Sequence, residues 1–231
     1  MDAAADRTAL IVGASRGLGL GLAKALLDRG WRVTGTVRGR DRTGLHDLAD
    51  QIGERLDIES VDITEPDQIA GLAQRLAGRR FDLLFVNAGV SGDTEAPMGT
   101  VSTEMFDQVM VTNVLGPLRV IEACQGLLAP DATVAAMSSG LGSIAGNTTG
   151  SWETYRASKA ALNMALKSFA ARASGKTVIA MAPGWVRTDM GGPGAPLGVE
   201  ESTTGMAEVL EREAGRPGMR YLDYRGRTLE W

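Results

Sequence analysis

The chain has 231 residues with a hydrophobic fraction of 44%, and its formal net charge of −4 provides no electrostatic basis for binding nucleic acid. This length suits one substantial domain spanning 1–231 and is short for two. A single histidine, His46, and a single cysteine, Cys124, exclude a histidine–cysteine metal cluster and an internal disulfide, and Cys124 is expected to be a buried small hydrophobe.

The first residues, MDAAADRTALIVGAS, carry acidic side chains where a signal peptide carries positive charge. The apolar run that follows stops at Gly13, and nowhere in the chain does an apolar run reach the roughly eighteen residues of a membrane span. The sequence therefore predicts a cytoplasmic protein with no membrane partner.

Short apolar runs alternate with helical patterns along the chain. Helical spacing is clear at 17–30, which ends on Gly30, and at 64–78, where Thr64 is the expected N-cap and Pro66 lies in the first turn. Strands are expected at 8–14, 31–37, 55–63, 81–89, 132–139, 176–184 and 219–224. This alternation predicts an α/β fold with a doubly wound parallel sheet, helices on both faces and right-handed crossovers.

A glycine-rich turn follows the first expected strand and leads directly into a helix. Backbone N–H groups at such a turn and the positive end of the helix dipole favour a pyrophosphate. Glycines at this spacing are weak evidence in a chain with 30 of them, but the position between strand and helix favours dinucleotide binding over a purely structural turn. The candidate cofactor residues here are Gly13, Ser15, Arg16, Gly17, Leu18 and Gly19.

The second strand ends in TGTVRGR, with no Asp or Glu between 33 and 40. An acidic side chain there would accept a hydrogen bond from the ribose 2′-hydroxyl of NAD. Arg38, together with Arg16, instead suits a 2′-phosphate, which predicts NADP(H) in preference to NAD(H). The alternative is that Arg38 is an ordinary solvated arginine.

The segment SWETYRASKAALNM, 151–164, places Tyr155 four residues before Lys159 on one face of a helix. Carbonyl reduction needs an acid that gives a proton to oxygen, and a free tyrosine, with a pKa of about 10, is too weak. A nearby cation lowers the pKa of a phenol, and a value near 7 requires about 4 kcal/mol of preferential stabilisation of the phenolate. The pair thus indicates an acid–base site; the alternative is a core tyrosine beside a solvated lysine.

These motifs, with five others, follow the order found in the short-chain dehydrogenase/reductase family, and the resemblance covers essentially the whole chain. The others are Asp62 in VDIT, NAG at 87–89, Asn113 in VTNVLG, MSSG at 137–140 and PGWVRTDMGG at 183–192. The resemblance implies a single Rossmann domain with a seven-stranded sheet and a catalytic tetrad of Asn113, Ser139, Tyr155 and Lys159. In the second half of the chain, SSGLGSIAGNTTGSWETYRASKAALNM at 138–164 and YLDYRGRTLEW at 221–231 look most like the carbonyl-reductase branch of the Sniffer and C-factor type.

Two positions depart from the family pattern. Val12 stands where a threonine is usual, which removes one hydrogen bond from the glycine turn. Ser139 lies further before Tyr155 than is usual, so Ser138 and Ser143 remain alternatives for the catalytic serine. The longer loop is expected at the substrate mouth.

The resemblance also implies roles for residues outside the tetrad. Asp62 would contact the adenine edge, with Ile63 packing nearby, although an acid that starts a helix is the alternative for Asp62. Ser139 would hydrogen-bond the substrate oxygen, and Asn113 would hold a helix kink and a proton-relaying water; a turn cap and a structural helix bend are their alternatives. The cofactor floor would comprise Asn87, Ala88 and Gly89, and the nicotinamide end Pro183, Gly184, Val186 and Thr188.

The expected function is reduction of a ketone or aldehyde, or oxidation of the alcohol, by an NADPH-dependent enzyme acting on a small molecule. The alternatives are an NAD(P)-binding signalling or regulatory protein with little turnover, and a reductase of a carrier-bound acyl chain. The family commonly forms two-fold assemblies, so a homodimer or homotetramer is expected through the helix before 176 and the helix over 103–128.

Three segments are expected to form an apolar substrate wall, namely 90–100, 140–152 and 189–204. They contribute Met98, Trp152, Met190 and Leu197. Within 189–205, glycines and prolines predict a mobile loop or lid. Trp185 is expected either to contact the cofactor or to belong to the core.

Overall fold

The computed structural model describes residues 7–173 and 175–231. Seven parallel strands form one sheet in the order β3-β2-β1-β4-β5-β6-β7, which confirms the doubly wound α/β prediction. The strands are β1 Thr8–Val12, β2 Arg32–Val37, β3 Leu56–Ser60, β4 Phe81–Val86, β5 Leu128–Met137, β6 Thr177–Ala182 and β7 Gly218–Asp223. The chain reverses direction across the sheet between β1 and β4, and open α/β sheets bind ligands at such a point.

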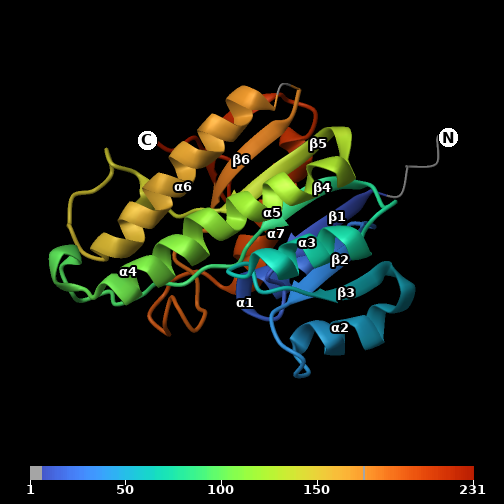
Figure 1. The fold of residues 1–231 in the computed structure, drawn as a ribbon, viewed down its shortest axis with the longest axis horizontal. Helices are drawn as coiled ribbons and strands as arrows, with labels where there is room; N and C mark the ends of the chain where they lie inside the picture. Colours follow the sequence, from blue (N-terminus) through green and yellow to red (C-terminus); the bar gives the residue numbers. More distant parts are fainter. Residues whose placement is uncertain (1–6, 174) are drawn as a thin grey trace.

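Helices cover both faces of the sheet (Figure 1). They are α1 Gly17–Asp28, α2 Gly44–Ile52, α3 Pro66–Arg75, α4 Thr103–Met110, α5 Gly116–Cys124, α6 Glu153–Arg172 and α7 Val199–Glu213. In β1, Ala9 and Ile11 join the core cluster that contains residues of α1, α2 and α7, whereas Leu10 and Val12 join the cluster with α3, α5 and α6. Both strand faces are apolar because each meets a helical layer.

Several strands end two or three residues before the expected boundary. After Val12, Val86 and Met137 the chain leaves the sheet at its carboxyl edge, and these are the places where the motif residues lie. At the other end, β5 begins at Leu128, earlier than expected, with an irregular register beside β4 between Phe81 and Leu83.

Two helix predictions need correction. Glu65, not Thr64, is the N-cap of α3, because the Thr64 hydroxyl donates to Asp62 Oδ1 at 2.7 Å. The helix expected over 103–128 is divided by a π-helical turn at Val111–Leu115 between α4 and α5. Cys124 is fully buried as expected, and burial raises the pKa of its thiol to about 11.

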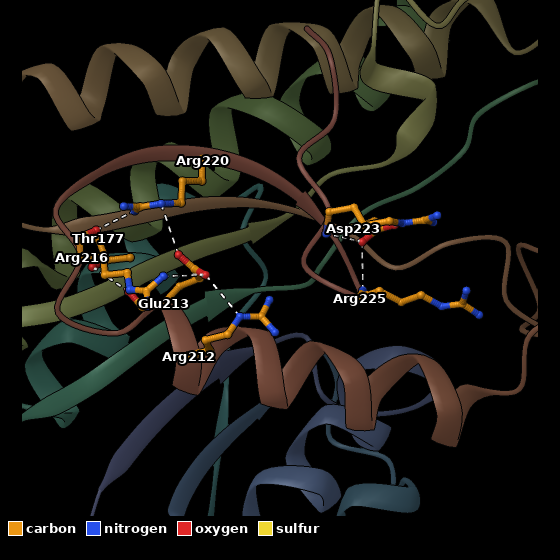
Figure 2. Close-up of polar contacts among 8 residues, drawn as sticks. Thr177, Arg212, Glu213, Arg216, Arg220, Asp223 and Arg225 are labelled. Carbon is orange, nitrogen blue, oxygen red and sulfur yellow. Dashed lines mark hydrogen bonds and ion pairs between the residues drawn. The ribbon is translucent and has the colours of Figure 1, made fainter.

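Buried carboxylates flank β7 (Figure 2). Glu213, at the end of α7, forms ion pairs with three arginines, namely Arg212, Arg216 and Arg220. Asp223, at the end of β7, accepts hydrogen bonds from the backbone N–H groups of Arg225 and Arg227. The resulting turn sends residues 228–231 back along β7, where the Leu229 N–H donates to the Tyr221 carbonyl oxygen at 2.9 Å.

Within residues 7–173 and 175–231, no helix combines the length and the apolar character needed to cross a membrane.

Candidate active site

The glycine turn between β1 and α1 is closely packed and braced from two sides. Gly13 has a φ of +90°, and a Cβ placed there would lie 2.9 Å from the backbone nitrogen of Ala88. The Gly13 N–H donates to Thr36 Oγ1 at 3.0 Å, and the Asn87 amide donates to the Gly13 carbonyl at 2.7 Å. Thr36 on β2 therefore holds the turn in a chain that has Val12 before the first glycine.

The start of α1 fits a phosphate group. Among the described residues no side chain caps this helix at Arg16, and its first turn contains no acid, so the first N–H groups are available to an anion. A Cβ at Gly17 would meet only the Thr188 methyl group, 3.8 Å away, whereas a Cβ at Gly19 would lie 2.1 Å from the Gly13 carbonyl oxygen. There is therefore free space beside Gly17 for a ligand, whereas Gly19 packs directly against the backbone of the turn.

Of the two arginines expected to select the cofactor, Arg38 is exposed at the end of β2. Arg16 instead forms an ion pair with Asp189, in which both side chains are largely exposed. This pair links the glycine turn to the start of the expected lid.

Asp62 and Ile63 follow β3 near this region. Oδ1 of Asp62 accepts hydrogen bonds from the Thr64 N–H at 2.9 Å and from the Thr64 hydroxyl, which forms a turn before α3 without capping that helix. Ile63 is buried in the core cluster with residues of α3 and α5. Its carbonyl oxygen approaches Gly116 so closely that a Cβ there would lie 2.7 Å away.

Ser139, Tyr155 and Lys159 come together where β5 ends beside α6. The Ser139 hydroxyl lies near the Tyr155 phenol and favours its ionised form. Nζ of Lys159 lies 5.5 Å from the centroid of the Tyr155 ring and donates to the Met137 carbonyl oxygen at 2.8 Å. Both residues are buried, with 8% of Tyr155 and 2% of Lys159 exposed.

Burial dominates the titration of this pair. It raises the pKa of Tyr155 to about 12, against the opposing effect of the nearby Ser139 hydroxyl, and it lowers the pKa of Lys159 to about 8. The expectation that Lys159 lowers the pKa of the Tyr155 phenol to near 7 is therefore wrong for the protein chain alone. The reason is that a buried phenolate loses its hydration, while the lysine directs its hydrogen bond to the backbone.

The geometry distinguishes the three candidate serines. Ser138 is buried and donates to Asn163 Oδ1 at 2.7 Å. Ser143 accepts a hydrogen bond from the Gly146 N–H at 2.9 Å. Ser139 also caps the short turn that follows it, accepting from the Leu141 N–H at 3.1 Å, so its expected role as a turn cap accompanies its contact with Tyr155.

Asn113 lies in the π-helical turn and is completely buried. Its side chain accepts from the Val90 N–H and donates to the Val90 carbonyl oxygen, both at 2.8 Å, and it also donates to Ser158 Oγ at 3.0 Å. Ser158 donates in turn to the Tyr155 carbonyl oxygen at 2.7 Å. Asn113 therefore connects the segment after β4 to the turn of α6 that carries Tyr155, and the expected helix bend is present.

The expected substrate wall is divided between surface and core. Met98 and Met190 are exposed, whereas Leu197 packs against the core cluster beneath α1 and α7. Trp185 is 60% exposed, which removes the core alternative, and its indole N–H donates to the Gly191 carbonyl oxygen at 2.8 Å.

Trp152 contacts the tyrosine directly. Its ring meets the Tyr155 ring edge to face, with centroids 5.6 Å apart. It precedes α6 with a φ of +62°, and no other non-glycine residue among those described has a positive φ. Such a conformation is costly for a bulky residue and is often found at functional sites.

Sequence reasoning missed three supporting residues. They are Thr36, which braces the glycine turn; Glu153, whose carboxylate accepts from the Met98 N–H at 2.9 Å; and Tyr221, whose phenol donates to the Ser139 carbonyl oxygen. Each acts across a long sequence separation through a backbone group, so no local spacing pattern indicates it. For Tyr221, the sequence signals are the rarity of tyrosine, with three in the chain, and its place in YLDYRGRTLEW, which carries part of the family resemblance.

A doubly wound sheet with an open helix N-terminus at its switch point and a Ser-Tyr-Lys group at the same edge defines a nucleotide-dependent oxidoreductase. A family model described as short chain dehydrogenase matches residues 7–195. The chain belongs to the short-chain dehydrogenase/reductase family.

Relatives of known structure match nearly the whole chain. A short-chain dehydrogenase/reductase from Burkholderia multivorans with bound NADP is 53% identical, with a TM-score of 0.96, and the match covers 98% of this chain and 100% of that one. A carbonyl reductase from Pseudomonas aeruginosa PAO1 is 38% identical over 97% of this chain and 100% of its own, with a TM-score of 0.91.

The narrower resemblance is confirmed as well. The C-signal of Myxococcus xanthus is 41% identical over 154 residues, which make up 65% of this chain and 92% of that protein. The carbonyl reductase Sniffer of D. melanogaster is 33% identical, with a TM-score of 0.87, over 97% of this chain and 99% of its own.

Proposed function

We propose that the chain is an NADPH-dependent carbonyl reductase that reduces a ketone or aldehyde and can oxidise the corresponding alcohol. The observation that carries this proposal is the buried Tyr155–Lys159 pair, with Lys159 Nζ 5.5 Å from the centroid of the Tyr155 ring, at the end of the strand that leads to Ser139. The carbonyl reductases among the related structures favour the same reaction class.

Each member of the site has a distinct task in this proposal. Tyr155, whose raised pKa keeps it protonated at neutral pH, gives its proton to the carbonyl oxygen of the substrate. Ser139 donates a hydrogen bond to the same oxygen, and Lys159 stabilises the phenolate that remains. Asn113 holds the turn of α6 in place through Ser158.

NADP(H) is the proposed cofactor, and when bound it supplies the hydride. Arg38 and Arg16 would pair with the 2′-phosphate, and Arg16 would exchange its ion pair with Asp189 for that contact. The remaining proposed cofactor residues are Gly13, Ser15, Gly17, Leu18, Gly19, Asp62, Ile63, Asn87, Ala88, Gly89, Tyr155, Lys159, Pro183, Gly184, Val186 and Thr188. The NADP bound to the Burkholderia multivorans relative supports this choice.

The substrate is proposed to be a small, fairly apolar carbonyl compound beneath a lid formed by 189–205. Apolar side chains exposed on α4, on the π-helical turn and on α6 support assembly as a homodimer or homotetramer; they are Phe106, Leu115 and Met164.

Loss of NADPH absorbance across a panel of ketones and aldehydes tests the function. We expect turnover by the wild type and none by Tyr155→Phe, with the folded state and NADPH affinity of that variant preserved. Full activity of Tyr155→Phe would refute the assignment.

The similarity to C-signal favours a second candidate, an NAD(P)-binding signalling protein with little turnover. Tight NADPH binding by the wild type, with no consumption of NADPH on any carbonyl compound, would favour this candidate over the reductase.

A further inference from the structure

Three consecutive residues at the end of β5 are each held by a different side chain. The Met137 carbonyl accepts from Lys159, and the Ser138 hydroxyl donates to Asn163. The Ser139 carbonyl accepts from the phenol of Tyr221, which lies on β7 and is 82 residues away in the chain. We call residues 137–139 the β5 ledge. The first two contacts come from the helix of the proposed catalytic residues, and the third comes from a different element.

Tyr221 is built into this position. Only 1% of the residue is exposed, and Asn163 and Ser138, which are hydrogen-bonded to each other, act on its pKa against the effect of burial. Burial raises the pKa of Tyr221, so the phenol stays neutral and remains a donor. The Ser139 carbonyl oxygen has a second partner in the Gly142 N–H, at 2.9 Å. Both of its acceptor positions are therefore occupied, which fixes the peptide plane directly after Ser139.

Trp231 holds Tyr221 from the other side. The two rings are stacked, with centroids 5.3 Å apart and an interplanar angle of 28°. Residues 228–231 follow the turn organised by Asp223 and return to β7, where the Leu229 N–H donates to the Tyr221 carbonyl oxygen. The Trp231 carbonyl oxygen accepts from the Ala145 N–H at 2.9 Å. The loop that separates Ser139 from Tyr155 is thus anchored to the segment that follows β7.

We propose that Tyr221, supported by Trp231, is a positioning residue that orients Ser139 toward the Tyr155 phenol. It acts through the backbone of Ser139 and does not touch the substrate. Without the Tyr221 hydroxyl, the Ser139 carbonyl loses one of two partners, and the serine side chain samples orientations that do not reach Tyr155. This inference rests on the proposed reductase function for its kinetic consequence, but the structural link stands independently of turnover.

Tyr221→Phe tests the kinetic consequence because it removes one hydroxyl and keeps the ring that Trp231 stacks on. We expect kcat for carbonyl reduction to fall about tenfold, while the Kd for NADPH stays within about twofold of the wild type. The nearby Ser139 hydroxyl favours the phenolate of Tyr155. In Tyr221→Phe, the part of the pH–rate profile of alcohol oxidation that reports Tyr155 should therefore move to higher pH. Thr8→Val is the matched control. It removes a hydroxyl that donates to the Arg80 carbonyl at the start of β1, at the end of the sheet away from Ser139. That control should leave this part of the profile in place.

Hydrogen exchange on the free protein tests the structural link without substrate. Tyr221→Phe should speed exchange of the Gly142 amide at least fivefold, and Trp231→Ala should do the same for the Ala145 amide, with core-strand amides unchanged. Trp231 is 49% exposed, so its variant is expected to fold even if Tyr221→Phe does not. Wild-type exchange at both amides would overturn the inference, as would an unchanged kcat and pH–rate profile in Tyr221→Phe when the wild type is active. A wild type without turnover would defeat the proposed function alone, and exchange would still decide this inference.

Discussion

The ammonium group of Lys159 donates a hydrogen bond to the Met137 carbonyl oxygen at 2.8 Å, although only 2% of the lysine is exposed. A single neutral acceptor does not replace the water that a lysine loses on burial, so the charged form is disfavoured. The pKa of Lys159 is accordingly lowered from 10.5 to about 8. The protein thus keeps a lysine at the site at the expense of folding stability.

This burial predicts a specific pH dependence of stability. Between pH 8 and pH 10.5, the unfolded chain carries a proton on Lys159 that the folded chain lacks, so the free energy of unfolding should rise with pH in this window. The full contribution is about 3 kcal/mol. Urea unfolding of the wild type and Lys159→Met, compared from pH 8 to just below pH 10, should show the rise in the wild type alone. The upper limit avoids Tyr155, whose raised pKa acts with the opposite sign between pH 10 and about pH 12. Parallel curves for the two proteins would contradict the prediction.

Arg38 should decide the preference between the two nicotinamide cofactors. Arg38→Ala is expected to raise the KM for NADPH about tenfold and to leave the KM for NADH almost unchanged, because only NADPH carries the phosphate that a guanidinium can pair with. Arg40→Ala, which changes another exposed arginine in the same loop, serves as the control. An equal change in the KM for both cofactors would show that Arg38 does not bind the 2′-phosphate.

Trp152 combines an unfavourable backbone conformation with a contact to Tyr155. Trp152→Gly and Trp152→Ala both remove the ring and should raise the KM for apolar carbonyl compounds. The free energy of unfolding should be about 1 kcal/mol higher for the glycine variant than for the alanine variant, because only glycine adopts a φ of +62° without steric cost. Thermal unfolding measures the difference; a more stable alanine variant would mean that the backbone at 152 relaxes once the ring is lost.

The buried carboxylate at the end of α7 should matter more for stability than an exposed one on the same helix. Glu213→Ala leaves three arginines facing one another around an apolar side chain (Figure 2) and is expected to lower the free energy of unfolding by about 1–2 kcal/mol, because the arginines remain partly exposed to water. Glu208→Ala removes an ion pair with Arg29 in which the glutamate is 59% exposed, and it should cost less than about 1 kcal/mol. Equal losses in denaturant unfolding would indicate that water screens the Glu213 cluster as well.

The sequence was sufficient to predict the order of strands and helices and the Tyr155–Lys159 pair. Apolar runs and helical spacing report directly on which residues face a core, and glycine at position 13 reports on a conformation that other residues avoid. The direction of the Tyr155 pKa shift was not predictable, because it depends on how much water reaches the phenol. The partners of Asp62 and the placement of Leu197 likewise depend on how the loops pack. The roles assigned to the tetrad and to the cofactor residues remain predictions that the experiments above address.

The contacts at the β5 ledge separate the support of Ser139 from the neighbouring loop that is expected to contact the substrate. The supports of the ledge come from α6 and β7, so the stretch over 147–151 contributes nothing to holding Ser139. Its link to the reacting groups is indirect, through Arg156, which follows Tyr155 and donates to the Ser151 carbonyl and to the Thr149 hydroxyl. Exchange of these residues between relatives is therefore expected to change substrate preference while Ser139 keeps its supports.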